Sequence, residues 1–194
     1  MYKLAFKREI LRKLIHLSTL FFPLFLYCYG KQKCLPYFLL CGILFISFDI
    51  CRQKSNLIKS IYNYFFSTIT RNHEDKGLTG ASYVFLSVIL ITFIFDKNIA
   101  IVSLLIMIFP DASASLFGRY FGNFKIYDKS LEGSLVFFIV SCIILIFFSF
   151  PYLESIVVAL FCTTVELLSN KIKIDDNFLI PFTASVTIFF LQYI

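Results

Sequence analysis

Seven apolar runs, separated by short polar connections, make up most of the chain. Each run is 16 to 19 residues long, slightly under the ~20 residues that a straight membrane crossing needs, so flanking residues must extend most of them. Helices are expected, because open strands would leave backbone groups without hydrogen-bond partners in lipid. The runs cover residues 14–29, 35–50, 80–95, 99–117, 134–150, 152–168 and 178–194.

Residues 54–70, between the second and third runs, follow a different pattern. Leu57, Ile61, Phe65 and Ile69 recur at helical spacing with polar residues between them, which predicts an amphipathic helix. Such a helix either lies in the membrane interface or packs on the other spans, and the pattern favours neither. We therefore predict an all-α integral membrane protein, a single domain over residues 1–194, with about seven transmembrane helices and one interfacial helix.

The composition agrees with this prediction. The chain is 59% hydrophobic and 15% charged, with a mean hydropathy of +0.82. Soluble domains are about 45–50% apolar and about 25% charged, so both a soluble domain and a disordered chain are excluded. The net charge of +6 comes from basic residues that flank apolar runs, which indicates membrane lipids rather than nucleic acid as the partner.

The basic residues also predict the orientation. In a seven-span arrangement, fifteen of the 18 lysines and arginines fall on the side of the N-terminus, and only Lys31, Lys33 and Lys97 fall on the other. Positive residues favour the cytoplasmic side, which places the N-terminus in the cytoplasm and the C-terminus outside. Part of the N-terminal arm, Lys3, Lys7 and Arg8, is interpreted as an anchor for anionic lipid headgroups.

Asp111 is the clearest ionisable residue at membrane depth. Within the run 99–117 it lies about 18 Å past the first residue, on the cytoplasmic half. A carboxylate there needs a partner or a hydrated cavity, and is by default a functional hypothesis. Pro110, directly before it, is expected to kink or interrupt the helix.

A face of small residues continues from Asp111. Ser115, Gly118 and Gly122 follow it at i+4, i+7 and i+11, on one side of a helix. Small residues on a membrane helix most often mean tight helix packing. Because this face begins with the carboxylate of Asp111, we favour the interpretation that it lines a ligand-binding cleft over helix packing alone.

Four further polar clusters lie at predicted cytoplasmic ends of spans. Glu9 and His16 share a helical face with two cations of the N-terminal arm, and Lys129 begins the segment K-S-L-E-G-S before the fifth span. A lysine with hydroxyls and a glycine at a helix start can hold an anionic phosphate. The clusters are Glu9, Arg12, Lys13 and His16; Thr79 to Ser82; Lys129 to Ser134; and Glu166 with Asn170, followed by Asp175, Asp176 and Asn177, where either aspartate could cap the last helix.

These residues resemble the CTP-dependent membrane kinases of lipid alcohols, a family that includes dolichol, phytol and diacylglycerol kinases. The specific part of the resemblance is D-A-x-A-x-x-x-G-R-x-x-G from Asp111, followed by K-S-x-E-G from Lys129. Arg12-Lys13 with His16, Thr79-Gly80, and Glu166 with Asp176-Asn177 extend it over nearly the whole chain. Pro110 departs from the pattern, in which a glycine is expected.

The resemblance implies transfer of the γ-phosphoryl group of CTP to a lipid alcohol, normally with Mg²⁺ or another divalent cation. The count of basic residues places this site on the cytoplasmic face, and we expect the membrane to be a bacterial inner membrane. Asp111 and Glu166 would hold the metal, and Glu166 or Asp176 would act as general base. The catalytic residues expected are Asp111, Lys129, Glu132, Glu166 and Asp176, and those expected to bind the nucleotide are Arg12, Lys13, His16, Ser115, Gly118, Arg119, Gly122, Ser130 and Gly133.

Two alternatives remain open from the sequence. A phosphatidate cytidylyltransferase resembles the same central region, but its later signature, H-G-G-x-x-D-R-x-D, has no counterpart after Gly133. A non-catalytic membrane scaffold or carrier would tolerate substitution of Asp111 and Lys129.

Overall fold

The computed structural model describes residues 2–66, 77–127, 129–172 and 174–192. Nearly all of these residues are helical, which confirms the all-α prediction. The helices are α1 (Tyr2–Ser18), α2 (Phe21–Tyr29), α3 (Lys31–Lys54), α4 (Asn56–Phe66), α5 (Gly80–Ile94), α6 (Lys97–Phe121), α7 (Leu131–Phe147), α8 (Tyr152–Ile172) and α9 (Asp176–Gln192). A hairpin of two-residue strands, β1 (Lys125–Ile126) and β2 (Lys129–Ser130), precedes α7.

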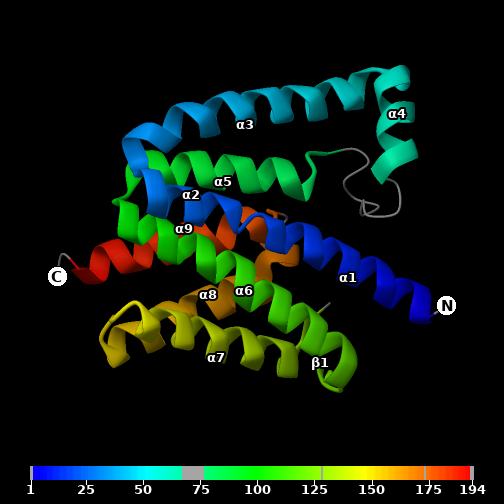
Figure 1. The fold of residues 1–194 in the computed structure, drawn as a ribbon. Helices are drawn as coiled ribbons and strands as arrows, with labels where there is room; N and C mark the ends of the chain where they lie inside the picture. The colour runs from blue at the N-terminus through cyan, green and yellow to red at the C-terminus, as the bar shows by residue number, and fades with distance from the viewer. Residues whose placement is uncertain (1, 67–76, 128, 173, 193–194) are drawn as a thin grey trace.

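Four segments of the described chain are long and apolar enough to cross a membrane: Glu9–Tyr29, Lys31–Lys54, Lys97–Phe121 and Tyr152–Ser169. Helices α5, α7 and α9 are shorter, at 15, 17 and 17 residues, so the number of seven crossings stays a prediction. In Figure 1, α1 begins at one end of the bundle and α9 ends at the opposite end, as an odd number of crossings requires.

The first predicted span is divided between two helices. The Ser18 hydroxyl donates to the Ile15 carbonyl and the Thr19 hydroxyl to the His16 carbonyl, each at 2.6 Å, which ends α1. Pro23, which has no backbone N–H, lies in the first turn of α2, where its missing donor costs little. Of the two expectations for Pro110, an interruption is wrong, because α6 continues through it as one helix, and a kink stays a prediction.

Helix α6 is the centre of the bundle. Most of its residues are buried, and α7, α9, α2 and α1 all pack against it. In Figure 1, α3 and α5 run side by side above α6, while α7 and α8 lie below it. Asp111 of α6 is therefore placed in the interior by these neighbours rather than exposed to lipid, whereas Arg119 near the end of the helix is exposed.

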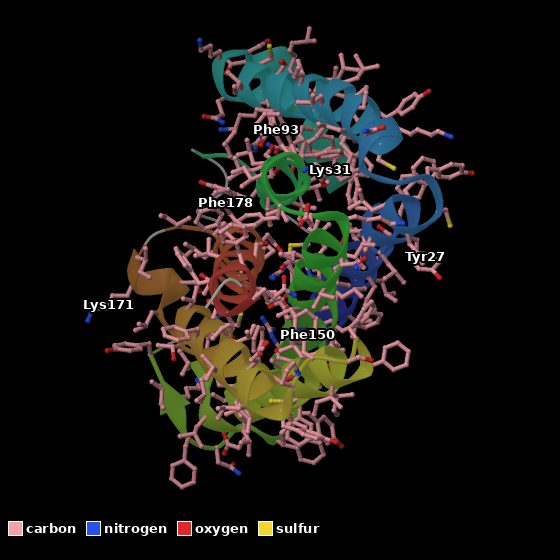
Figure 2. The ribbon with its side chains drawn as sticks, turned by 90° about the vertical axis from the view of Figure 1, so that its left-hand side faces the viewer. Tyr27, Lys31, Phe93, Phe150, Lys171 and Phe178 are labelled. Carbon is pink, nitrogen blue, oxygen red and sulfur yellow. The ribbon has the colours of Figure 1, made fainter. Side chains whose placement is uncertain are left out.

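Two lysines fasten one end of the bundle. Lys31 donates to the Phe95 carbonyl and Lys97 to the Tyr27 carbonyl, each at 3.0 Å, so each lysine satisfies a carbonyl at or just past a helix end. Figure 2 views this end, with Tyr27 and Lys31 labelled and apolar side chains projecting outward around the bundle. All six cysteines are free thiols, and Cys28, Cys41 and Cys51 are exposed.

Helix α4 is the predicted amphipathic helix, observed over Asn56–Phe66; positions 67–70 of the prediction lie outside the described residues, as do the side chains of residues 2–8. It has no buried residue, and Leu57, Ile61, Tyr64 and Phe65 are all at least half exposed. Figure 1 shows it turned away from the end of α3. An apolar face without protein cover favours the interfacial interpretation.

Candidate active site

A cavity of about 1170 Å³ lies at the end of the bundle where α1, α6 and α8 meet the starts of α7 and α9. It is the end opposite to the Lys31 and Lys97 contacts. Of the residues predicted from the sequence, all but Glu132 and His16 line it: Arg12, Lys13, Asp111, Ser115, Gly118, Arg119, Gly122, Lys129, Ser130, Gly133, Glu166 and Asp176. Five segments far apart in the chain therefore contribute to one polar chamber.

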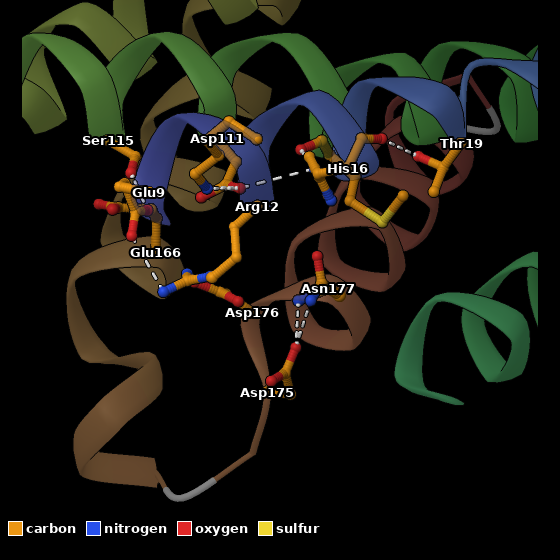
Figure 3. Close-up of polar contacts among 12 residues, drawn as sticks. Glu9, Arg12, His16, Thr19, Asp111, Ser115, Glu166, Asp175, Asp176 and Asn177 are labelled. Carbon is orange, nitrogen blue, oxygen red and sulfur yellow. Dashed lines mark hydrogen bonds and ion pairs between the residues drawn. The ribbon is translucent and has the colours of Figure 1, made fainter. Parts of the chain in front are cut away.

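Asp111 is 7% exposed and faces α1. Its Oδ2 accepts a hydrogen bond from Lys13 Nζ at 2.5 Å, and His16 Nε2 lies 3.5 Å from the same oxygen. Figure 3 shows Asp111 opposite His16, across the interface between α6 and α1. The buried carboxylate thus has the cation that burial at this depth demands.

His16 lies beside this pair without lining the polar cavity. Its Nε2 is 3.2 Å from the Met107 carbonyl oxygen as well as 3.5 Å from Asp111 Oδ2. Both neighbours are acceptors, so in the neutral ring the proton belongs on Nε2. The histidine instead lines a second, apolar cavity.

Glu9 joins three groups at the cavity wall. Its carboxylate accepts from Ser115 Oγ at 2.8 Å and forms ion pairs with Arg12 at 3.0 Å and Arg119 at 2.8 Å. Glu9 is only 3% exposed, and Figure 3 shows it between Ser115 and Arg12. The sequence placed it on the correct helical face without giving it a role, which the structure supplies: it positions two guanidinium groups at the rim.

Lys129 joins the carboxylates of α8 and α9. Its Nζ lies 2.7 Å from Glu166 Oε1 and 3.4 Å from Asp176 Oδ2. Burial alone lowers the pKa of Lys129, but the charges of Asp176 and Glu166 outweigh it and hold the pKa above the ordinary lysine value. Lys129 is therefore a fixed cation at neutral pH.

The hairpin before α7 sets the position of Lys129. Ile126 pairs with Lys129, and Tyr127 has a positive φ of 57° in the turn between the strands. Glu132 stabilises the chain that enters this hairpin, because its Oε1 accepts from the backbone N–H groups of Asn123 at 2.8 Å and Phe124 at 3.1 Å. The structure thus places Glu132 outside the cavity lining, where it supports the hairpin; its expected catalytic role stays a prediction.

Glycines bring α6 and the start of α7 into direct contact. A Cβ added to Gly133 would lie 2.8 Å from the Ala114 carbonyl oxygen, and one added to Gly118 would lie 2.4 Å from Ser130 Oγ. Ser130 is also the N-cap of α7, accepting from the Gly133 N–H at 3.1 Å. The small face that starts at Asp111 therefore both packs helices tightly and lines the cavity.

The start of α9 separates the roles of two aspartates. Asp175 Oδ1 accepts from the backbone N–H and the side-chain Nδ2 of Asn177, at 3.0 and 2.7 Å, which makes Asp175 the helix cap. Asp176 instead lines the cavity opposite Lys129. Of the two aspartates that the sequence allowed as the cap, Asp175 is the one that accepts these hydrogen bonds.

The predicted polar segment Thr79 to Ser82 is part of a buried cluster behind the cavity, whose centre, Asp49 with Arg52, was missed by sequence reasoning. Asp49 and Arg52 form an ion pair at 2.9 Å and are 2% and 1% exposed. Asp49 Oδ2 accepts from the backbone and hydroxyl of Thr79, at 2.7 and 3.0 Å, and from Ser82 Oγ at 2.6 Å. The only sequence signal was a carboxylate inside an apolar run, three positions before an arginine.

The cavity contains carboxylate donors for a metal ion, but among the residues described they do not form a closed group. In residues 2–66, 77–127, 129–172 and 174–192, no three His, Cys, Asp or Glu side chains form a group that could hold a metal ion. Asp111, Glu166 and Asp176 nevertheless line one cavity, and carboxylates are ligands that Mg²⁺ prefers. Because Mg²⁺ is commonly held by one or two carboxylates together with substrate phosphates, the residues fit a metal that binds with a phosphorylated ligand.

The fold and the site together define an α-helical membrane protein with a charged chamber at one end. The chain is 34% identical to the uncharacterized protein RP860 of Rickettsia prowazekii, over 95% of this chain and 96% of that protein. It belongs to the same family as that protein. No family model matches the chain, and no solved structure matches it.

Relatives with a named activity are similar over a shorter part. The chain is 31% identical to CTP-dependent diacylglycerol kinase 1 of Schizosaccharomyces pombe, over 69% of this chain and 63% of the kinase. It is 30% identical to CTP-dependent diacylglycerol kinase 1 of Saccharomyces cerevisiae, over 71% of this chain and 49% of the kinase. The chain therefore spans between about half and two thirds of these kinases, and the relationship supports the family resemblance.

Proposed function

We propose that this chain is a membrane kinase that transfers the γ-phosphoryl group of CTP to a lipid alcohol. One observation carries the proposal: Asp111, Lys129 and Asp176 line a single cavity together with the cations Arg12 and Lys13. Phosphoryl transfer needs positioning and neutralisation of charge more than covalent chemistry. The relationship to diacylglycerol kinases that use CTP supports the donor and makes diacylglycerol the first acceptor to test.

The charges suit a nucleotide triphosphate. Arg12, Lys13, Arg119, Lys125 and Lys129 are the cations of the cavity lining, and α7 presents its N-terminus there through Ser130 and Gly133. A helix N-terminus and nearby lysines favour phosphate oxygens. We propose that Lys13 and Lys129 exchange their carboxylate partners in part for phosphate when CTP enters.

Mg²⁺ is proposed to bind with the nucleotide. Asp111 and Glu166 would hold it together with phosphate oxygens. The metal would neutralise charge that develops on the β- and γ-phosphates. Asp176 is assigned the role of general base that accepts the proton of the lipid hydroxyl, because it lines both cavities whereas Glu166 lines only the polar one.

The proposed place is a bacterial inner membrane, with about seven crossings, the N-terminus and the polar cavity on the cytoplasmic side and the C-terminus outside. The bias of basic residues supports this orientation. CTP in the cytosol would then enter the charged chamber directly.

The position of a label on CTP distinguishes a kinase from a phosphatidate cytidylyltransferase. Purified protein in detergent micelles is given CTP labelled in either the γ- or the α-phosphate, with diacylglycerol, phytol and a polyprenol as acceptors. We expect label in lipid only from γ-labelled CTP. Label from the α-phosphate, with phosphatidate as acceptor, would indicate a cytidylyltransferase, and no transfer from either would indicate a scaffold or carrier.

A further inference from the structure

A second cavity, of about 480 Å³, adjoins the polar one. Its surface is mainly apolar, and its lining residues come from seven helices, α1 to α6 and α9. Phe22 of α2, Phe45 and Phe48 of α3, Tyr62 of α4 and Phe85 of α5 are representative. An apolar chamber of this kind suits a hydrocarbon chain rather than a nucleotide.

The two cavities share one charged wall. Arg12, Lys13, Asp111 and Asp176 line both of them. The same buried carboxylates are therefore reached from a polar side and from an apolar side. This is the arrangement that a reaction between a phosphorylated and a hydrocarbon substrate requires.

Away from that wall, four polar side chains of the apolar cavity already have hydrogen-bond partners. The hydroxyls of Ser18 and Thr19 donate to backbone carbonyls of α1, and the hydroxyl of Thr79 donates to Asp49. The amide of Asn177 donates to Asp175. An occupant thus finds polar partners mainly at the charged end and hydrocarbon along the rest, which matches a molecule with one polar end.

Helix α4 forms one wall of the apolar cavity, and a specific contact with α3 holds it there. Tyr62 and Phe66 of α4 line the cavity, while the opposite side of α4 is exposed. The Arg52 guanidinium lies 4.5 Å from the centre of the Tyr62 ring, and Arg52 is fixed by Asp49. The ion pair of Asp49 and Arg52 therefore holds α4 against the cavity. If α4 lies in the membrane interface, this wall is beside the region from which a lipid would enter.

We infer that the apolar cavity is the acceptor subsite, which holds the hydrocarbon of a lipid alcohol with its hydroxyl at Asp111 and Asp176. This inference rests on the proposed function and adds where, and in which direction, the lipid binds. The hydroxyl loses its proton to Asp176, its oxygen bonds to the γ-phosphorus, and the bond from that phosphorus to the β–γ bridging oxygen breaks. CDP leaves with the electron pair, and the proton passes to solvent.

Ala81→Phe tests the subsite with little disturbance of the fold. Ala81 is exposed and lines the apolar cavity but not the polar one, so a phenyl group there fills the lipid path alone. Ser47→Phe is the matched control, because Ser47 is also exposed but lines neither cavity. With the alcohol that the wild type phosphorylates, Ala81→Phe is expected to raise the apparent KM for the alcohol about tenfold, with the KM for CTP within about twofold.

A photoreactive hexadecanol carrying a diazirine provides a readout that needs no activity. We expect saturable labelling of peptides that contain Phe45, Phe48, Tyr62 or Phe85, reduced in Ala81→Phe and unchanged in Ser47→Phe. If the wild type transfers phosphate but labelling maps elsewhere, or if Ala81→Phe leaves the KM for alcohol unchanged, the subsite is wrong and the kinase stands. If these residues are labelled without phosphate transfer, the lipid-alcohol site stands and the proposed kinase function is wrong.

Discussion

Lys13 and Asp111 are 98 positions apart in the chain, yet their side chains form a buried ion pair in the lining of the polar cavity. The pair joins α1 to α6. Both residues belong to the wall that the two cavities share.

Removing Lys13 alone should destabilise the protein. Lys13→Met leaves the Asp111 carboxylate buried without its cation, which typically costs about 3–5 kcal/mol in free energy of unfolding. The double variant Lys13→Met/Asp111→Leu should recover most of this stability but no activity. Thermal unfolding in detergent measures both, with Lys33→Met, an exposed lysine at the other end, as control. Equal stability of Lys13→Met and wild type would contradict the structural role of the pair.

Glu9→Gln should weaken nucleotide binding more than it affects the chemical step. Gln keeps an acceptor for Ser115 but loses the charge that positions Arg12 and Arg119. We expect the KM for CTP to rise by roughly fivefold to tenfold while kcat changes by less than about twofold. Glu154→Gln is the control, because Glu154 lies in the first turn of α8, at the end of that helix away from the cavity. This variant should resemble the wild type. A fall in kcat at unchanged KM would show that Glu9 acts in the reaction itself.

The contribution of Lys129 to stability should persist into alkaline solution. Its pKa is raised in the folded protein, so the ion pairs with Glu166 and Asp176 are fully present below the ordinary lysine value of 10.5. They are lost only as the pH rises through the higher folded-state pKa. The difference in unfolding temperature between wild type and Lys129→Gln should stay constant from about pH 7 to 10 and shrink above that. A difference that vanishes below about pH 9 would mean that Lys129 is not held by these carboxylates.

The two glycine contacts should differ in cost. A methyl group at Gly133 meets a backbone carbonyl of α6, whereas one at Gly118 first meets the Ser130 hydroxyl, a side-chain atom that can rotate away at the expense of its cap hydrogen bond. Gly133→Ala is therefore expected to lose about 1–3 kcal/mol of stability, and Gly118→Ala less. Chemical denaturation of both variants in detergent gives the order. The reverse order would show that the contact between α6 and α7 is looser than the structure has it.

Much of the site followed from the sequence because membrane burial makes charges conspicuous. Asp111 and Glu166 lie within apolar helices, and the spacing of Ser115 and Gly118 after Asp111 places them on one face. The count of basic residues predicted which helix ends gather together. These signals suffice to bring Asp111 and Lys129 into one cavity, as the structure does.

The remainder depends on contacts between distant segments. In the sequence, Asp49 is a single carboxylate in an apolar run, and Arg52 looks like one of the basic residues that flank such runs. Their ion pair and the hydrogen bond from Thr79 become visible only when α3 packs on α5. The hairpin that positions Lys129 has two-residue strands, too short to give an alternating pattern. In the sequence, Glu132 belongs to a segment that predicts phosphate binding. In the structure, its carboxylate accepts hydrogen bonds from backbone N–H groups of the preceding loop.

Transfer of label from γ-labelled CTP to lipid alcohol, compared between wild type and Asp111→Asn, tests the central proposal most directly. Asn keeps the shape of the side chain but removes the charge that pairs with Lys13 and is proposed to hold the metal. The account predicts labelled lipid phosphate from the wild type and a loss of at least about a hundredfold in Asp111→Asn, in protein that remains folded. Transfer by Asp111→Asn at the wild-type rate would contradict it.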